Sequence, residues 1–294
     1  MLKSFFKKHV ENFQRFTGLY ELIKVQAIVQ ENEYQKLKNE CRQNFEGSLA
    51  LFGKKVYSQT DEDGIIEEIF KRIPNNKTFI EIGIQTGVEC NSLNLLLNGW
   101  KGAWVEGNDK YCNVIANDLG GLSFKDKLTV INSFIDKDNI SDVFRQAYQF
   151  FAIKELDLFS LDIDGNDYYI MEVLLQNEFL PKVVCVEYNA KFEPPVNIKI
   201  KYNKDHIWDT SDYMGCSLQA YVDLFKQYGY TLVCCNLTGI NAFFVRNEFV
   251  HLFEIYEIAE IYQPYRYYLS PIKLAQFPTL RYLRDQINDS LSNI

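Results

Sequence analysis

The stretch "IEIGIQTGVECNS", residues 80 to 92, decides the fold. It begins as an apolar strand, contains the acid Glu81, and then has two glycines four residues apart, Gly83 and Gly87. A glycine turn directly after a buried strand is typical of doubly wound α/β proteins, in which ligands bind beyond the carboxyl ends of the strands. We therefore expect a ligand site at this turn.

The same pattern of strand and helix continues outward from the turn. Short apolar runs predict strands, and longer amphipathic runs between them predict helices. Strands are predicted at 78–83, 102–108, 127–133, 156–164 and 182–189, with helices at 89–99, 109–119, 138–151 and 167–177. Alternating strands and helices imply right-handed crossovers and a parallel sheet covered on both faces.

The later part of the chain predicts an antiparallel end to this sheet. A helix is expected at 217–229, followed by strands at 230–236 and 241–247 joined as a hairpin. We expect the last strand to enter antiparallel at the sheet edge. The predicted fold class is therefore α/β, with a Rossmann-like sheet of seven strands.

The spacing of the glycines argues against a dinucleotide. The fingerprint G-x-G-x-x-G would place its second and third glycines at Gln85 and Val88. Without the second glycine a pyrophosphate cannot approach the backbone closely. A second acid, Glu106, follows the next strand 19 residues after Gly87 and is placed to accept both hydroxyls of a ribose. This arrangement resembles that of class I methyltransferases, which bind S-adenosylmethionine.

Composition limits the classes of partner. The chain has 294 residues and a formal net charge of −8, which argues against broad binding to nucleic acid. Its seven cysteines are odd in number and form no CxxC pair, so we expect buried thiols in a reducing cytoplasm. No run of apolar residues is long enough to span a bilayer.

Two extensions flank the predicted methyltransferase domain of residues 51–247. Residues 1–50 show helical periodicity, and residues 248–294 are rich in Tyr, Leu and Ile. The N-terminal helices pack either on the main domain or on a second copy of the chain, and contact with a membrane surface is the weaker alternative. The tail would cover the core or a dimer seam.

Several motifs together resemble the FkbM-like methyltransferases. They are "YSQTDEDGIIEEIFKRI" (57–73), "WVEGND" (104–109), "LDLFSLDIDGNDYYIMEVLL" (156–175) and "VVCVEYNA" (183–190), together with the glycine turn and the final helix and hairpin. The resemblance covers residues 55 to 247 and leaves both extensions unassigned. It implies O-methylation of a sugar, nucleotide-sugar or glycan in bacterial capsule or lipopolysaccharide synthesis.

The resemblance also implies which residues hold the cofactor. The turn would line the methionine arm, Glu106 would hold the ribose with Asn108 nearby, and the end of the third strand would face the adenine. Ser58 and Gln59 would fold over the cofactor from outside the sheet, and Thr60 or Asp61 would cap the helix that follows. The predicted cofactor-binding residues are Ser58, Gln59, Glu81, Gly83, Gln85, Thr86, Gly87, Glu106, Asn108, Asn132, Ser133 and Asp162.

Acidic residues at the ends of the fourth and fifth strands are the candidates for catalysis. Asp162, Asp164 and Asp167 at the end of the fourth strand should converge on one rim with Glu187 and Asn189 at the end of the fifth. There they would share a metal ion, hold a proton or bind a polyhydroxyl substrate. The predicted catalytic residues are Asp164, His206 and Asp162, with Asp164 placed ahead of His206 as the base. The predicted ligands of a Mg²⁺ ion are Asp164, Glu187 and Asn189.

A loop after the fifth strand, at 190–214, should hang over the cofactor as a lid. Its Trp208 and Tyr213 would stack on a sugar or anchor the loop to the core. Two other interpretations of the whole chain stay open. One is a methyltransferase-shaped scaffold without catalysis in a glycan-assembly complex, and the other is a methyltransferase for a small molecule or lipid.

Overall fold

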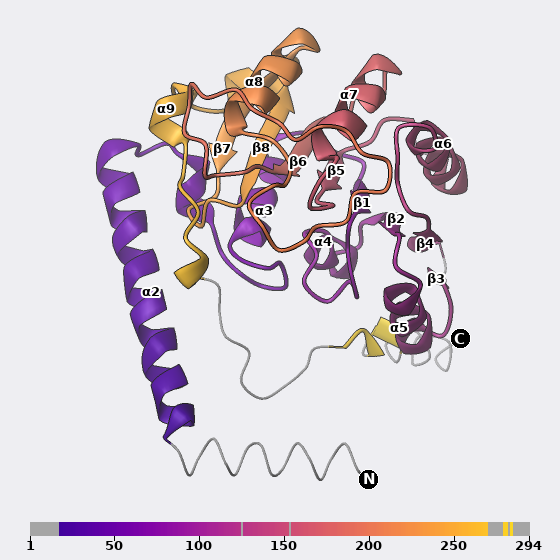
Figure 1. Cartoon of the computed structure of the whole chain (residues 1–294), viewed down its shortest axis with the longest axis horizontal. Coiled ribbons are helices and arrows are strands. Elements are labelled where there is room, and N and C mark those ends of the chain that lie inside the picture. The colour runs from indigo at the N-terminus through magenta and orange to yellow at the C-terminus, as the bar shows by residue number, and fades with distance from the viewer. Residues whose placement is uncertain (1–17, 125, 153, 270–278, 282, 285–294) are drawn as a thin grey trace.

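The computed structural model describes residues 18–124, 126–152, 154–269, 279–281, 283 and 284 (Figure 1). Among them lies an eight-stranded sheet in the order β3-β4-β2-β1-β5-β6-β8-β7. The strands are β1 Thr78–Ile82, β2 Lys101–Glu106, β3 Ser123–Phe124, β4 Leu128–Asn132, β5 Leu158–Leu161, β6 Val183–Glu187, β7 Tyr230–Cys235 and β8 Asn241–Arg246.

The predicted strand positions and the parallel core of the sheet are confirmed. Strands β4, β2, β1, β5 and β6 pair in parallel, and β8 runs antiparallel to both β6 and β7. The sequence did not indicate β3, a two-residue strand that pairs antiparallel with β4 at the edge.

The position of the last strand differs from the prediction. β8 does not lie at the edge, because it pairs with β6 along its length, from Val183↔Val245 to Glu187↔Asn241. β7 therefore occupies the edge. The hairpin pattern predicts that β7 and β8 pair with each other, but both strands are apolar, so the local pattern does not say which of them joins the sheet.

Helices cover both faces of the sheet (Figure 1). One core joins α3, α4 and α5 to the sheet, and the other joins α6, α7 and α8 to its opposite face. The bounds are α3 Glu62–Arg72, α4 Leu93–Leu97, α5 Asp109–Leu119, α6 Ile140–Phe151, α7 Asp167–Gln176 and α8 Leu218–Gln227. Alternate residues of β1 serve the two cores: Phe79 packs toward α3–α5, whereas Ile80 and Ile82 pack toward α6–α8.

The two extensions are partly described. The N-terminal one contains α2, Leu19–Asn44, and η1, Leu49–Phe52, and residues 1–17 of the predicted helical region lie outside the described part. The C-terminal one contains η2, Asn247–Leu252, α9, Ile258–Ile261, and η3, Tyr267–Leu269. All seven cysteines are buried, as expected. No helix in the described part of the chain has the length and hydrophobicity needed to cross a bilayer.

Candidate functional site at the carboxyl edge of the sheet

The glycine turn is shaped by close packing on the neighbouring strand. Gly83 has a φ of +85°, and a Cβ built there would lie 1.6 Å from the carbonyl oxygen of Asp162. Its backbone N–H donates to the carbonyl of Val105 at 3.0 Å. Only a glycine fits here, because the backbone is left-handed and there is no room for a Cβ. The chain can therefore turn at the end of β1, between β2 and β5.

Glu106 lies at this rim and is fixed by the backbone. One carboxylate oxygen accepts the N–H of Gln85 at 2.7 Å, and the other accepts the N–H of Asn108 at 2.8 Å. Glu106 is 8% exposed, and burial raises the pKa of its carboxyl group. Each carboxylate oxygen offers about two lone-pair sites, so both can still accept a hydroxyl. This geometry fits a pair of ribose hydroxyls.

Glu81 has a structural role that the sequence did not reveal. One carboxylate oxygen accepts the N–H of Asn91 at 2.8 Å, and the other accepts the N–H of Ser92 at 2.8 Å and also its hydroxyl. Burial raises the pKa of the Glu81 carboxyl group. The side chain thus anchors the loop that leads into α4, which explains why α4 begins later than the predicted residue 89.

Gly87 also serves packing. A Cβ at Gly87 would lie 2.7 Å from the ring of Trp104, whose Nε1 donates to the Ser92 hydroxyl at 2.8 Å. Thr86 is half-buried, whereas Gln85 is exposed on the rim with a φ of +51°. Of these three, Gln85 and Thr86 are the residues whose side chains have access to a ligand.

The segment before α3 is tied down from within. The hydroxyl and the N–H of Ser58 both donate to one carboxylate oxygen of Asp63, each at 2.8 Å. Ser58 is fully buried, so this geometry gives it an internal partner, whereas Gln59 is exposed. Asp61 occupies the N-cap position of α3, one of the two positions predicted. Its side chain, however, makes no capping hydrogen bond.

The predicted adenine-side residues lie beside Glu106. Asn132 pairs in register with Glu106 across β2 and β4, and its amide donates to Asp109 at 2.7 Å. The N–H of Ser133 donates to the Glu106 carbonyl at 3.0 Å. Asn108 caps α5, and its side chain accepts the N–H of Lys110. The structure thus brings Gln85, Asn108, Asn132 and Ser133 together around Glu106.

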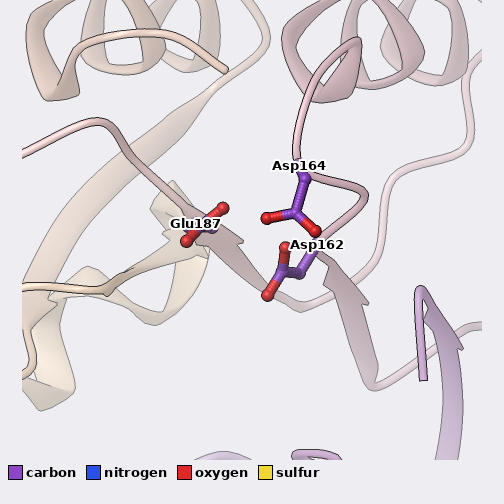
Figure 2. A group of neighbouring side chains, drawn as sticks. All are labelled: Asp162, Asp164 and Glu187. Carbon is purple, nitrogen blue, oxygen red and sulfur yellow. The ribbon is translucent and has the colours of Figure 1, made fainter. Parts of the chain in front are cut away.

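Three carboxyl groups meet at the ends of β5 and β6. Figure 2 shows Asp162, Asp164 and Glu187 turned toward one another, and one oxygen from each lies within 4.8 Å of the others. Burial raises the pKa of all three, and mutual repulsion raises the pKa of Asp162 and Glu187 further. The donor set, three carboxylates, fits a divalent cation that prefers oxygen ligands.

The side chain of Asn189, a predicted metal ligand, bonds the loop that follows β6. Its amide donates to the carbonyls of Asp212 at 2.9 Å and Met214 at 3.1 Å, and its oxygen accepts the N–H of Lys191. It closes the base of the following loop. Asp162 stands in the cluster beside Asp164 and Glu187.

Asp167 holds the turn that carries Asp164. Its two oxygens accept the N–H groups of Ile163 and Gly165, each at 2.8 Å. Burial raises the pKa of Asp167 to about 6. Asp164 itself has a φ of +55°, a backbone conformation that L-residues adopt only when the surroundings fix it.

The loop of residues 190–214 folds over the acidic rim, and we name it the lid. His206 packs so tightly on the preceding turn that a Cβ at Gly165 would lie 2.2 Å from its Cδ2. Its Nε2 is buried and has no hydrogen-bond partner among the described residues. The charge of His206 lowers the pKa of Asp164, against the larger effect of burial. The structure thus brings His206 close to the turn that carries Asp164.

An asparagine missed in the sequence fastens the lid. The amide of Asn166 donates to the carbonyl of Asn203 at 2.7 Å, and its oxygen accepts the N–H of Asn203 at 3.4 Å. Asn166 is 4% exposed. Its signal in the sequence was its place in the segment Asp164-Gly165-Asn166-Asp167, directly before the helix α7.

The lid aromatics are held at the surface. Trp208 is 40% exposed and donates through Nε1 to the carbonyl of Ser211, and Tyr213 is 53% exposed and its hydroxyl accepts the N–H of Lys201. Both side chains anchor the lid to itself rather than to the core. Their exposed ring faces are accessible to a ligand.

Comparisons with known proteins give distant likenesses to solved structures. No family model matches the chain, and no curated protein matches it. Among solved structures, an O-methyltransferase from Bacillus cereus in complex with S-adenosylhomocysteine is 12% identical, with a TM-score of 0.37 over 57% of this chain and 72% of that one. A TehB-like S-adenosylmethionine-dependent methyltransferase from Corynebacterium glutamicum is also 12% identical, with a TM-score of 0.35 over 74% and 98%.

A human methyltransferase 10 domain containing protein is similar to the same degree, at 12% identity and a TM-score of 0.39 over 74% of this chain and 96% of that one. The strand order is that of a mixed α/β, Rossmann-like fold, with β8 between β6 and β7 and a short extra strand β3.

Proposed function

We propose that the protein is an S-adenosylmethionine-dependent O-methyltransferase of the FkbM-like type, acting on a sugar, nucleotide-sugar or glycan. The observation that carries this proposal is the rim around Glu106. There a buried carboxylate is oriented by two backbone amides beside a glycine turn that shows no dinucleotide spacing. When bound, S-adenosylmethionine supplies a methyl group that is already activated for transfer.

Glu106 would accept the ribose hydroxyls, and Gln85 and Thr86 would face the methionine arm. The neighbouring acids would favour the positive sulfonium, since opposite charges attract strongly where water is excluded. Asp162 joins these acids at the end of β5. The cofactor would therefore lie across β1 and β2, with its methyl group directed toward the acidic cluster.

Asp164 would remove the proton from the acceptor hydroxyl. Burial raises its pKa, and a carboxylate with a raised pKa is a stronger base. His206 lies beside it and is the second candidate. Alternatively, Asp162, Asp164 and Glu187 would hold a Mg²⁺ ion that lowers the pKa of the hydroxyl and orients it.

The test begins with calorimetric titration of S-adenosylhomocysteine. We expect binding by the wild type and a loss of about 10- to 100-fold in Glu106→Gln, because hydrogen bonds to a charged group contribute about 1.5–3 kcal/mol each. Glu89→Gln is the matched control, since it removes the same charge from the neighbouring loop between β1 and α4. Absence of binding by the wild type would refute the proposal and favour the scaffold.

The second stage supplies a labelled methyl donor and a panel of nucleotide-sugars, with and without EDTA. Labelled sugar that disappears in EDTA and returns with Mg²⁺ would support the cation, and full activity in EDTA would leave Asp164 as the base. If the cofactor binds but no sugar is labelled, the substrate class is wrong.

A further inference from the structure

The C-terminal extension reaches the acidic rim through residues 262–269, which we name the strap. Its first residues contact the segment after Glu187. The Tyr188 hydroxyl donates to the carbonyl of Gln263 at 2.6 Å, and the Tyr262 hydroxyl donates to the carbonyl of Ala190 at 2.5 Å. These bonds place the first residues of the strap beside the segment that directly follows Glu187.

The strap is also fixed to the turn between β7 and β8. Gly239 has a φ of +75°, and a Cβ there would lie 2.1 Å from the carbonyl oxygen of Pro264. The N–H of Arg266 donates to the carbonyl of Thr238 at 2.8 Å. The guanidinium of Arg266 donates to the side chain of Gln263 at 2.9 Å. Close packing and hydrogen bonds therefore hold the strap on both sides of Pro264.

The far end of the strap rests on the N-terminal helix. The amide of Gln30 in α2 donates to the carbonyl of Tyr268, and Figure 1 shows the strap descending from α9 toward α2. The strap thus crosses the carboxyl edge of the sheet at the β6–β8–β7 side, opposite the glycine turn at the end of β1.

This rigid segment presents two tyrosines to solvent. Tyr265 is 49% exposed and Tyr267 is 69% exposed, and their rings meet edge to face with centroids 5.1 Å apart. Burial raises the pKa of Tyr265, and the charge of Glu187 raises it further. Large aromatic rings held at the surface beside a group of carboxylates are a common feature of binding sites.

We propose that Tyr265 and Tyr267 form one wall of the acceptor site and take the ring of a sugar, stacked on Tyr265. This inference rests on the proposed function and adds a substrate-binding role for the C-terminal extension. The apolar C–H face of a sugar packs on an aromatic ring, while its hydroxyls donate to carboxylates. Glu187 and Asp164 of the acidic cluster would accept such hydroxyls, and the lid with His206 folds over the same rim.

Sugar binding can be measured without turnover. Saturation-transfer NMR on the protein loaded with S-adenosylhomocysteine, with UDP-glucose, GDP-mannose and dTDP-rhamnose as probes, should show transfer to the sugar C–H protons of at least one probe. Tyr265→Ala should weaken its binding about tenfold, and Tyr265→Phe should retain it because the ring remains. The affinity for S-adenosylhomocysteine should stay within about twofold in both variants.

Tyr268→Ala is the matched control, because Tyr268 belongs to the same strap and is equally exposed. Tyr268 bonds Gln30 of α2 through its backbone carbonyl, which the substitution keeps. Unchanged sugar binding in Tyr265→Ala, equal weakening in Tyr268→Ala, or no transfer to any sugar would overturn the inference while leaving cofactor binding intact. Failure of the wild type to bind S-adenosylhomocysteine would instead refute the proposed function.

Discussion

Gly83 shows how a missing side chain fixes the end of a strand. The residue combines a φ of +85° with a carbonyl oxygen 1.6 Å from where a Cβ would lie. Gly99 has nearly the same conformation, a φ of +84°, but no atom within 4 Å of its Cβ position. The two glycines therefore separate the cost of the backbone conformation from the cost of the steric clash.

We expect Gly99→Ala to lower the free energy of unfolding by about 1–2 kcal/mol, the usual cost of a left-handed L-residue. Gly83→Ala should lower it by about 1–3 kcal/mol more, because the neighbouring strand has to move. Urea unfolding of both variants measures the difference, and S-adenosylhomocysteine affinity should fall only in Gly83→Ala. Equal destabilisation by the two substitutions would contradict this account.

For single residues, the sequence predicted where a side chain lies in the fold better than which groups it bonds. Glu106 could be identified because an acid at the end of the second strand faces the rim whatever the packing. Glu81 could not be assigned, since β1 is buried on both faces and the sequence does not distinguish them. Its parity with Phe79 directs it toward α4, where the N–H groups of Asn91 and Ser92 need acceptors.

At the scale of elements, the lid depends on a contact that no local pattern encodes. Asn166 lies at the N-cap of α7, and Asn203 lies 37 residues later in the lid. An asparagine before a helix predicts a cap, yet its side chain makes no capping bond and bonds the lid backbone instead. The position of β8 was mistaken for the same reason, since pairing with β6 is a long-range choice.

We expect Asn166→Ala to loosen the lid without unfolding the domain. Loss of the two bonds to Asn203 should accelerate amide exchange of residues 201–208 about tenfold, because each hydrogen bond contributes about 0.5–1.5 kcal/mol. Hydrogen-exchange mass spectrometry measures this directly. Asn177→Ala, at the other end of α7, is the control and should leave the lid unchanged. An unchanged lid in Asn166→Ala would show that other contacts hold it.

At the scale of the whole molecule, a buried polar network joins three distant parts of the chain. Asp61 is 3% exposed and accepts hydrogen bonds from Tyr34 of α2 at 3.0 Å and from Asn236 at 3.1 Å. The N–H of Leu237 and the hydroxyl of Thr238 donate to the same carboxylate. The N-terminal helix, the start of α3 and the β7–β8 turn thus meet at one carboxyl group. The periodicity of residues 1–50 predicted the helix, but it could not reveal that Tyr34 of this helix bonds to Asp61.

The network makes the stability of the protein depend on pH in a defined direction. Burial, and then the charge of Glu62, raise the pKa of Asp61 from 3.8 to about 6. The folded protein therefore holds this proton more tightly than the unfolded chain does. The stabilisation is complete below the unfolded pKa and is lost as the pH rises through the folded value, so folding should weaken between about pH 4 and pH 6.

Asp61→Asn removes this titration. The difference in unfolding free energy between wild type and variant should favour the wild type most at pH 4.5 and should shrink by about 2 kcal/mol by pH 7.5. Urea unfolding at both pH values measures it, and Asp205→Asn on the exposed lid is the control with no such change. Asp167, whose pKa is also about 6, remains in both proteins and cancels in the comparison. A difference that grows with pH would mean that Asp61 is ionised in the fold, with Asn236 and Tyr34 as its charge-stabilising donors.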